Sequence, residues 1–246
     1  MKSEIKLLMI FSAILVSMIP ATQVFAQVDG SIPIHNTFSN SKKCFANPSP
    51  GVDWSGCSVS SKIGLYFKDL SGANLSKIVV KNSNFYAVNL SGANMQNAVL
   101  VSGDFAYANL SGADLRGADL RYVDFYHTNL SGADLRGANL LGARFPGVDF
   151  SNAKLSGLDM SHTNMIGANL SDTDLQNATL VGVDMRNAIF DDTNLKGANL
   201  ENSDVTGGSF ADSDLTGANL GGLDYSGTDM SCHGNPACLI VDKDIP

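Results

Sequence analysis

The chain has 246 residues, with 24 Asp or Glu against 16 Lys or Arg, a formal net charge of −8 and a pI near 4.8. This acidic balance argues against a protein that binds nucleic acid or an anionic membrane, because both favour basic surfaces. The 24 glycines and the single tryptophan are typical of a fold whose buried positions are small.

Residues 1–26 have the features of a secretory signal. Lys2 and Lys6 flank the start of an apolar run that extends from Leu7 to Ile19, and Val24-Phe25-Ala26 matches a cleavage motif before Gln27. The run is short for a membrane span, which needs about 20 residues. We therefore expect an exported chain, secreted or periplasmic, with no membrane association after cleavage. An uncleaved N-terminal anchor is the alternative.

Residues 27–62 are rich in Ser, Pro, Asn and Gly, and their large apolar residues are Phe38, Phe45 and Trp54. Two interpretations fit this segment, which precedes a regular repeat. It can be a cap that covers the first unit of the repeat, because an open sheet end exposes unpaired strand backbone. It can also be an arm that binds a partner. We favour the cap.

A five-residue repeat runs from Leu65 to Met230. Every fifth residue from Leu65 is apolar over 34 positions, apart from the hydroxyl of Tyr225. The residue two before each is usually small and most often Ala, with large exceptions that include Lys68, Ile78, Leu158 and Leu223, and the residue one before is mostly Asp or Asn. The two residues after it are mostly Ser, Gly, Arg or Asn. A period of five fits neither an α-helix nor an ordinary strand, so it predicts a repeat architecture.

Units such as Ala108-Asn109-Leu110-Ser111-Gly112 and Ala113-Asp114-Leu115-Arg116-Gly117 resemble the pentapeptide-repeat family. The resemblance covers about 170 residues. It implies an all-β solenoid, a right-handed parallel β-helix of quadrilateral cross-section with four units per coil. In that family the central apolar residue and the small residue two before it point inward. We expect this β-helix over residues 63–230, in about 8.5 coils, followed by a C-terminal cap at residues 231–246.

Two runs of residues support a coil of twenty residues without the family. Leu-Ser-Gly-Ala recurs every twenty residues from Leu70 to Leu130, and phenylalanine recurs at the same step from Phe85 to Phe145. This predicts stacked coils with a column of stacked phenylalanines. At about 4.8 Å per coil the stack would be about 40 Å long. Pro146 cannot donate a ladder hydrogen bond, so we expect a local bulge there.

The four cysteines lie outside the repeated units or at their last edge. In an exported chain an even number of cysteines predicts disulfides. Local pairing of Cys44 with Cys57 and of Cys232 with Cys238 is favoured, because a stack of about 40 Å separates the two pairs. A metal site that uses Cys232, His233 and Cys238 ranks below the disulfide, because it lacks a paired CxxC and a clear fourth ligand.

No group of residues converges for catalysis. The histidines are scattered, and the regularly spaced Asp residues are better explained by hydrogen bonding to local backbone than by acid–base chemistry. We therefore expect no enzyme, no metal and no cofactor. The favoured function is an exported scaffold that binds an unidentified protein or cell-envelope component. The alternative is an acidic inhibitor that mimics DNA, since some relatives in the family resemble a duplex and bind topoisomerases; export argues against it.

Grouping the residues by twenty places six aromatic side chains at outward positions on one face, in the N-terminal half of the repeat. This composition is typical of a recognition site, for a partner or for self-association into a homo-oligomer. The alternative is that the rings merely stack and stabilise the sheet. The six residues are Tyr66, Phe67, Tyr86, Tyr107, Tyr126 and His127.

Overall fold

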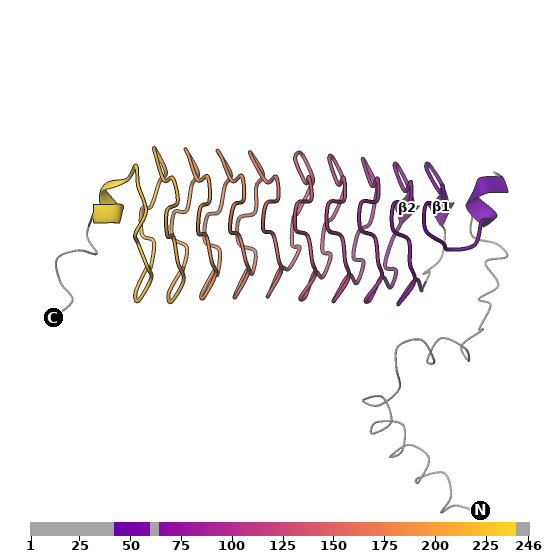
Figure 1. Ribbon diagram of the computed structural model, residues 1–246, viewed down its shortest axis with the longest axis horizontal. Coiled ribbons are helices and arrows are strands. Elements are labelled where there is room, and N and C mark those ends of the chain that lie inside the picture. The colour runs from indigo at the N-terminus through magenta and orange to yellow at the C-terminus, as the bar shows by residue number, and fades with distance from the viewer. Residues whose placement is uncertain (1–41, 60–63, 240–246) are drawn as a thin grey trace, which may run out of the picture. The chain divides into compact units, whose positions relative to one another are not determined.

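The computed structural model describes residues 42–59 and 64–239 (Figure 1). The chain divides into two units, Met1–His35 and Asn36–Pro246, and the described residues all belong to the second. The predicted signal at residues 1–26 and half of the segment 27–62 lie outside the described residues. Over the part that is described, no helix is long and apolar enough to cross a membrane.

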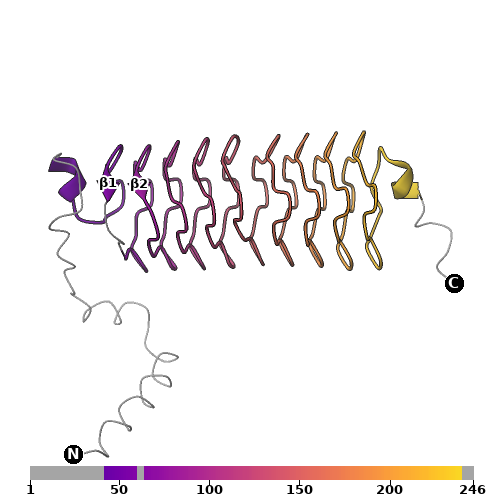
Figure 2. The ribbon, with the colours of Figure 1, turned by 180° about the vertical axis from the view of Figure 1, so that it is seen from behind.

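The described residues of the second unit form a parallel β-helix. A 3₁₀ helix, η3 (Lys42–Phe45), precedes it and another, η4 (Pro236–Leu239), follows it. Strands β1 (Ser58–Val59) and β2 (Val79–Val80) pair in parallel near its N-terminal end. From there the chain winds through a regular stack of coils (Figures 1 and 2). Parallel bridges join residues twenty apart along this stack, as between Asn109 and Asn129.

In a typical five-residue unit every backbone N–H group donates a hydrogen bond. We number the positions of a unit as slots 1 to 5, so that Ala108–Gly112 fills slots 1 to 5 in order. The N–H groups of slots 2, 3 and 5 donate to carbonyls of neighbouring coils. Slot 1 donates to the carbonyl of the preceding slot 3, and slot 4 donates to the side-chain oxygen of slot 2. In the unit 108–112 these bonds measure, from slot 1 to slot 5, 2.9, 2.9, 2.7, 3.1 and 2.8 Å.

This accounting explains the composition of the repeat. Slot 2 favours Asp or Asn because its side chain must accept the N–H of slot 4, and buried or half-buried N–H groups need a partner. Slot 5 has a left-handed backbone, with φ of 64° at Gly112 and 55° at Asn97. Only Gly adopts that conformation freely, and Asn tolerates it better than most residues. The preferred residues at slots 2 and 5 therefore follow from the backbone geometry of the unit.

The bulge expected at Pro146 is wrong. Pro146 fills slot 4, whose N–H, like that of slot 1, does not enter the ladder between coils, so its missing N–H breaks no ladder bond. The flanking donors Phe145 and Gly147 both reach the next coil at 2.8 Å, and the Pro146 carbonyl accepts the N–H of His127 at 3.0 Å. Slot 2 of the same unit is Arg144, whose side chain could not have accepted a slot-4 N–H.

The core consists of the side chains of slots 1 and 3. Phe85, Phe105, Phe125 and Phe145 are buried and form the predicted column, with successive ring centroids 4.4, 5.6 and 5.2 Å apart. This confirms the expected stacking of residues twenty apart. A hydroxyl in slot 1 is also satisfied, since Thr128 donates to a backbone carbonyl at 2.7 Å. The quadrilateral cross-section and the number of coils remain predictions.

Part of the segment expected to be a cap continues the ladder. Trp54 is buried and its N–H donates to the carbonyl of Asn74 at 2.8 Å, as a slot-3 residue does. Gly51 donates to Ser71 at 2.8 Å, as a slot-5 residue does. The bridges here join residues 21 apart, for example Asp53 with Asn74. Residues 51–59 thus lie as a partial coil against the first coil of the repeat.

Candidate interaction surface

The six predicted aromatic residues form one continuous line of ring contacts, which we call the aromatic strip. It consists of Tyr66, Phe67, Tyr86, Tyr107, Tyr126 and His127. Ring centroids of successive members lie 6.1, 5.6, 5.5, 5.5 and 4.3 Å apart, mostly edge to face. Tyr107 also stacks on His127 at 5.7 Å. Four of the rings belong to residues that are 40–59% exposed, so the strip is an apolar surface open to solvent.

Half of the strip occupies a backbone conformation that disfavours large side chains. Phe67, Tyr107 and His127 fill slot 5, with φ of 56°, 58° and 50°. A non-glycine residue in this left-handed region costs about 1–2 kcal/mol relative to the right-handed helical region. Slot 5 has this backbone along the whole solenoid, and Lys77, Ala87 and Ser102 also adopt it, so the conformation itself belongs to the fold. The rings therefore stand where the fold alone would favour Gly or Asn.

The side of the solenoid next to the strip carries few uncompensated charges. Asp104 and Asp124 stand in slot 2 of the units that contain Phe105 and Phe125. Each accepts the slot-4 N–H of its own unit, at 3.0 and 3.1 Å. Arg144, in the next coil along the chain, lies 3.8 Å from the Asp124 carboxylate. These three side chains sum to a formal charge of −1, so the surface beside the aromatic rings carries little net charge.

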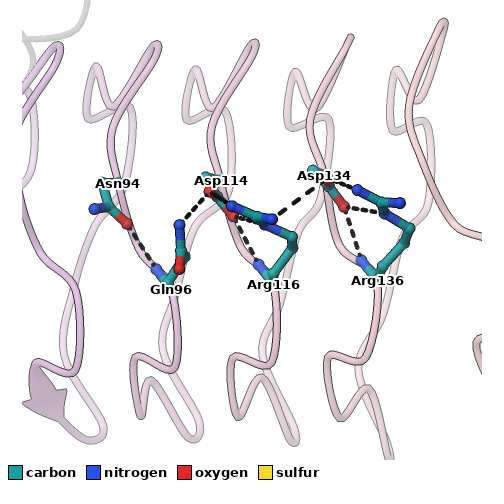
Figure 3. A network of polar contacts seen from close by, with 6 residues as sticks. All are labelled: Asn94, Gln96, Asp114, Arg116, Asp134 and Arg136. Atoms are coloured by element: carbon teal, nitrogen blue, oxygen red, sulfur yellow. Dashed lines mark hydrogen bonds and ion pairs between the residues drawn. The ribbon is translucent and has the colours of Figure 1, made fainter.

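Another side of the solenoid carries an Asp–Arg ladder (Figure 3). The Arg116 guanidinium donates two hydrogen bonds to Asp114, at 2.9 and 2.7 Å, and Arg136 repeats this on Asp134 at 2.9 and 2.6 Å. Gln96 donates to Asp114 from the coil below at 2.6 Å. Hydrogen bonds from Arg116 and Arg136 hold the pKa of each carboxyl below its usual value. These charges compensate one another and offer no open ligand position.

Charge is divided unevenly along the chain, a feature that the net charge conceals. Residues 42–169 contain 11 Lys or Arg and 9 Asp or Glu, a formal charge of +2. Residues 170–239 contain 2 and 11, a formal charge of −9. Within the second stretch Asp172, Asp192 and Asp212 all fill slot 5 on successive coils and are exposed. The aromatic strip lies in the first stretch, and the acidity lies in the second.

The cysteines pair locally in the structure. The sulfurs of Cys44 and Cys57 are 1.93 Å apart, and those of Cys232 and Cys238 are 2.15 Å apart. Both thiols of the rival metal site are thus in a disulfide. In the described stretches, no three His, Cys, Asp or Glu side chains are grouped as a metal would require. Two disulfide-distance pairs suggest an oxidising compartment.

Sequence reasoning missed four exposed large apolar residues outside the strip, of which Ile189 and Tyr225 are 42% and 38% exposed and the other two lie together. Tyr122 is 57% exposed and Leu141 is 62% exposed, on adjacent coils at the corner that precedes the Phe125 and Phe145 units. The Tyr122 ring lies over Gly142, where an added Cβ would come within 2.5 Å of it. The grouping of residues by twenty also places Tyr122 and Leu141 at outward slots of neighbouring coils. A search of all four sides for large apolar residues would therefore have found them. Tyr122, with φ of 59°, provides a natural control for Tyr107.

Comparison with known proteins gives a family and several similar structures. A family model described as pentapeptide repeats matches, as eight copies, residues 69–100, 104–137, 128–167, 168–207 and 193–231. No curated protein matches the sequence.

Three solved structures illustrate the similarity. HetL, a pentapeptide-repeat protein involved in the regulation of heterocyst differentiation in the cyanobacterium Nostoc, is 26% identical, with 74% of this chain and 86% of that chain covered and a TM-score of 0.39. Full-length QnrB1, a plasmid-mediated fluoroquinolone resistance protein, is 23% identical over 76% and 89%, with a TM-score of 0.42. A pentapeptide-repeat protein of the Arabidopsis thaliana thylakoid lumen is 31% identical over 37% and 67%, with a TM-score of 0.32.

The matched residues span well over half of the chain and follow the same five-residue repeat that the hydrogen bonds define. The protein therefore belongs to the pentapeptide-repeat family.

Proposed function

We propose that the protein is an exported, non-enzymatic scaffold that binds a protein or a cell-envelope component through the aromatic strip. The observation that carries this proposal is the presence of Phe67, Tyr107 and His127 in left-handed slots. Rings in these slots cost backbone energy, and they are half-exposed rather than buried. Because the rings lie outside the core, we expect them to contact another molecule. The proposed scaffold is a right-handed quadrilateral β-helix of about 8.5 coils over residues 63–230.

Export is part of the proposal and rests on two features. The segment 1–26 has the composition of a cleaved signal, and the two cysteine pairs suit an oxidising compartment. Intact mass of the exported protein should begin at Gln27 and show no free thiols. Four alkylatable thiols in native protein would contradict the oxidised state.

Crosslinking and affinity capture against the envelope fraction of the source organism test the binding function. The protein with Tyr86→Ser and Tyr126→Ser should lose the captured component while its circular dichroism stays unchanged. Tyr122→Ser, which removes a more exposed tyrosine outside the strip, should retain it. Unchanged capture by the double variant would refute the strip as the binding surface.

The acidic stretch supports a second candidate function, inhibition of a nucleic-acid-binding protein by resemblance to DNA. The charge of −9 over residues 170–239 is the specific observation that favours it. Asp172→Asn, Asp192→Asn and Asp212→Asn together remove three of these charges in a slot where Asn already occurs, as at Asn177. If this function holds, the triple variant should bind a basic partner less tightly. Localisation of the protein outside the cytoplasm would count against it.

A further inference from the structure

We propose that the aromatic strip joins two copies of this chain in an antiparallel homodimer. This inference rests on the proposed function, in which the strip is an interaction surface, and it names the partner. Two observations carry it independently: the exposed rings, and the separation of the rings from the acidic stretch.

The exposed area is of the size that suits a weak dimer. Tyr66, Phe67, Tyr107 and Tyr126 are 45%, 59%, 49% and 40% exposed. With about 200 Å² for a whole aromatic side chain, they offer together about 400 Å². A standard interface buries about 800 Å² per partner. The remaining area must come from Tyr86, His127 and their neighbours, so we expect an interface at the small end of the range, of the kind found in weak complexes.

Charge decides the orientation of the two copies. If the copies lay parallel, the stretches 170–239, each with a formal charge of −9, would lie side by side and repel each other. In the antiparallel arrangement the strips overlap and the acidic stretches extend in opposite directions. Only residues 42–169, which have a formal charge of +2 in each copy, then face each other, and the surface beside the strip carries little net charge. Like-charge repulsion is therefore smallest in this orientation.

The strip also suits a two-fold axis. A two-fold contact requires each surface patch to meet its own copy, so that residue i faces j and j faces i. With the axis between Tyr86 and Tyr107, Tyr66 and Phe67 of each copy face Tyr126 and His127 of the other. Both ends of the strip carry two adjacent rings in slots 4 and 5, so the ends match.

Sedimentation velocity of the purified protein, as the expressing cell processes it, tests the proposal over about 10 µM to 1 mM. We expect reversible dimerisation, weakened about tenfold or more by Phe67→Asn with Tyr107→Asn. Tyr122→Asn, in the same left-handed slot outside the strip, should dimerise as the unchanged protein does. A protein that stays monomeric up to 1 mM, or a dimer weakened equally by both changes, would overturn the proposal.

Small-angle scattering tests the orientation. At about 4.8 Å per coil, an antiparallel dimer centred on the strip is about 20 Å longer than the monomer, whereas a parallel dimer has the monomer length. A dimer of monomer length would overturn the antiparallel arrangement. Envelope capture separates this proposal from the function on which it rests. A monomeric protein whose capture still depends on Tyr86 and Tyr126 would overturn the dimer and leave the scaffold function standing.

Discussion

Replacing Tyr107 by Asn should leave the fold about as stable as before while weakening its associations. Tyr107 fills slot 5 with φ of 58°. A left-handed backbone costs an ordinary L residue about 1–2 kcal/mol. Asn tolerates it better and already occupies the same slot at Asn97 and Asn187. The substitution therefore relieves part of this backbone strain, which by itself raises the free energy of unfolding.

The opposing term is the loss of ring contacts. Tyr107 touches Tyr86, Tyr126 and His127. A buried aromatic pair contributes about 0.5–1.5 kcal/mol beyond its area, and each contact here is weaker because Tyr107 is 49% exposed. The two terms nearly cancel, so the free energy of unfolding should change by less than about 1 kcal/mol. For a chain of this size that is a shift in Tm of about 2–4 °C at most.

Thermal and denaturant unfolding followed by circular dichroism measure the change, with two reference variants. Tyr122→Asn, also in slot 5, should behave like Tyr107→Asn. Phe105→Ala, two residues before Tyr107 but fully buried, should destabilise by about 3–5 kcal/mol because it opens a cavity between Phe85 and Phe125. If Tyr107→Asn destabilises the protein by more than about 2 kcal/mol, the rings build the fold, and they need no partner to explain them.

Three further predictions address the solenoid itself. Deleting the five residues Ala118–Tyr122 shifts every later unit to the next side of the solenoid and breaks the phenylalanine column. Deleting the twenty residues 118–137 preserves the columns, so it should lower Tm less than the five-residue deletion. Equal losses of Tm would contradict a twenty-residue coil. Leu115→Asp buries an unpaired charge and should destabilise by several kcal/mol in denaturant titrations, while Arg116→Ala should cost less than about 1 kcal/mol. Hydrogen bonds lower the pKa of carboxyls such as Asp114 and Asp134 in the fold, so their contribution to stability is present above about pH 4 and is lost as the pH falls through the folded pKa. The free energy of unfolding should therefore be level from pH 7 to about pH 5 and decline below about pH 4. A decline that begins near neutrality would contradict this.

The columns of the solenoid could be predicted from the sequence because a strict repeat leaves few alternatives. Once residues twenty apart are placed on one side, Phe85 must lie against Phe105, and Tyr107 must lie near Tyr126. The structure confirms both contacts. No long-range pairing had to be guessed, since each coil pairs with the next one along the chain. This is why the aromatic strip could be predicted residue by residue.

The errors and omissions concern which backbone groups each slot uses. Pro146 was expected to disturb the ladder because a proline was treated alike at every position, whereas slot 4 donates to a side chain and not to the next coil. The left-handed backbone of slot 5 was equally hidden, although Gly and Asn recur there. Without it, the rings of Phe67 and Tyr107 could be recognised as aromatic and outward but not as strained.

Slot 5 is also where the chain changes its chemistry along its length. On one side of the solenoid it holds the rings of Phe67, Tyr107 and His127 in the first coils, and on the next side it holds the carboxylates of Asp172, Asp192 and Asp212 in the last coils. A residue in slot 5 adds nothing to the core, because slots 1 and 3 supply it, and the backbone conformation by itself favours Gly or Asn there. The exposed carboxylates have no ring contacts that would offset this backbone preference. We therefore expect both groups to serve contacts outside the chain, apolar near one end and cationic near the other.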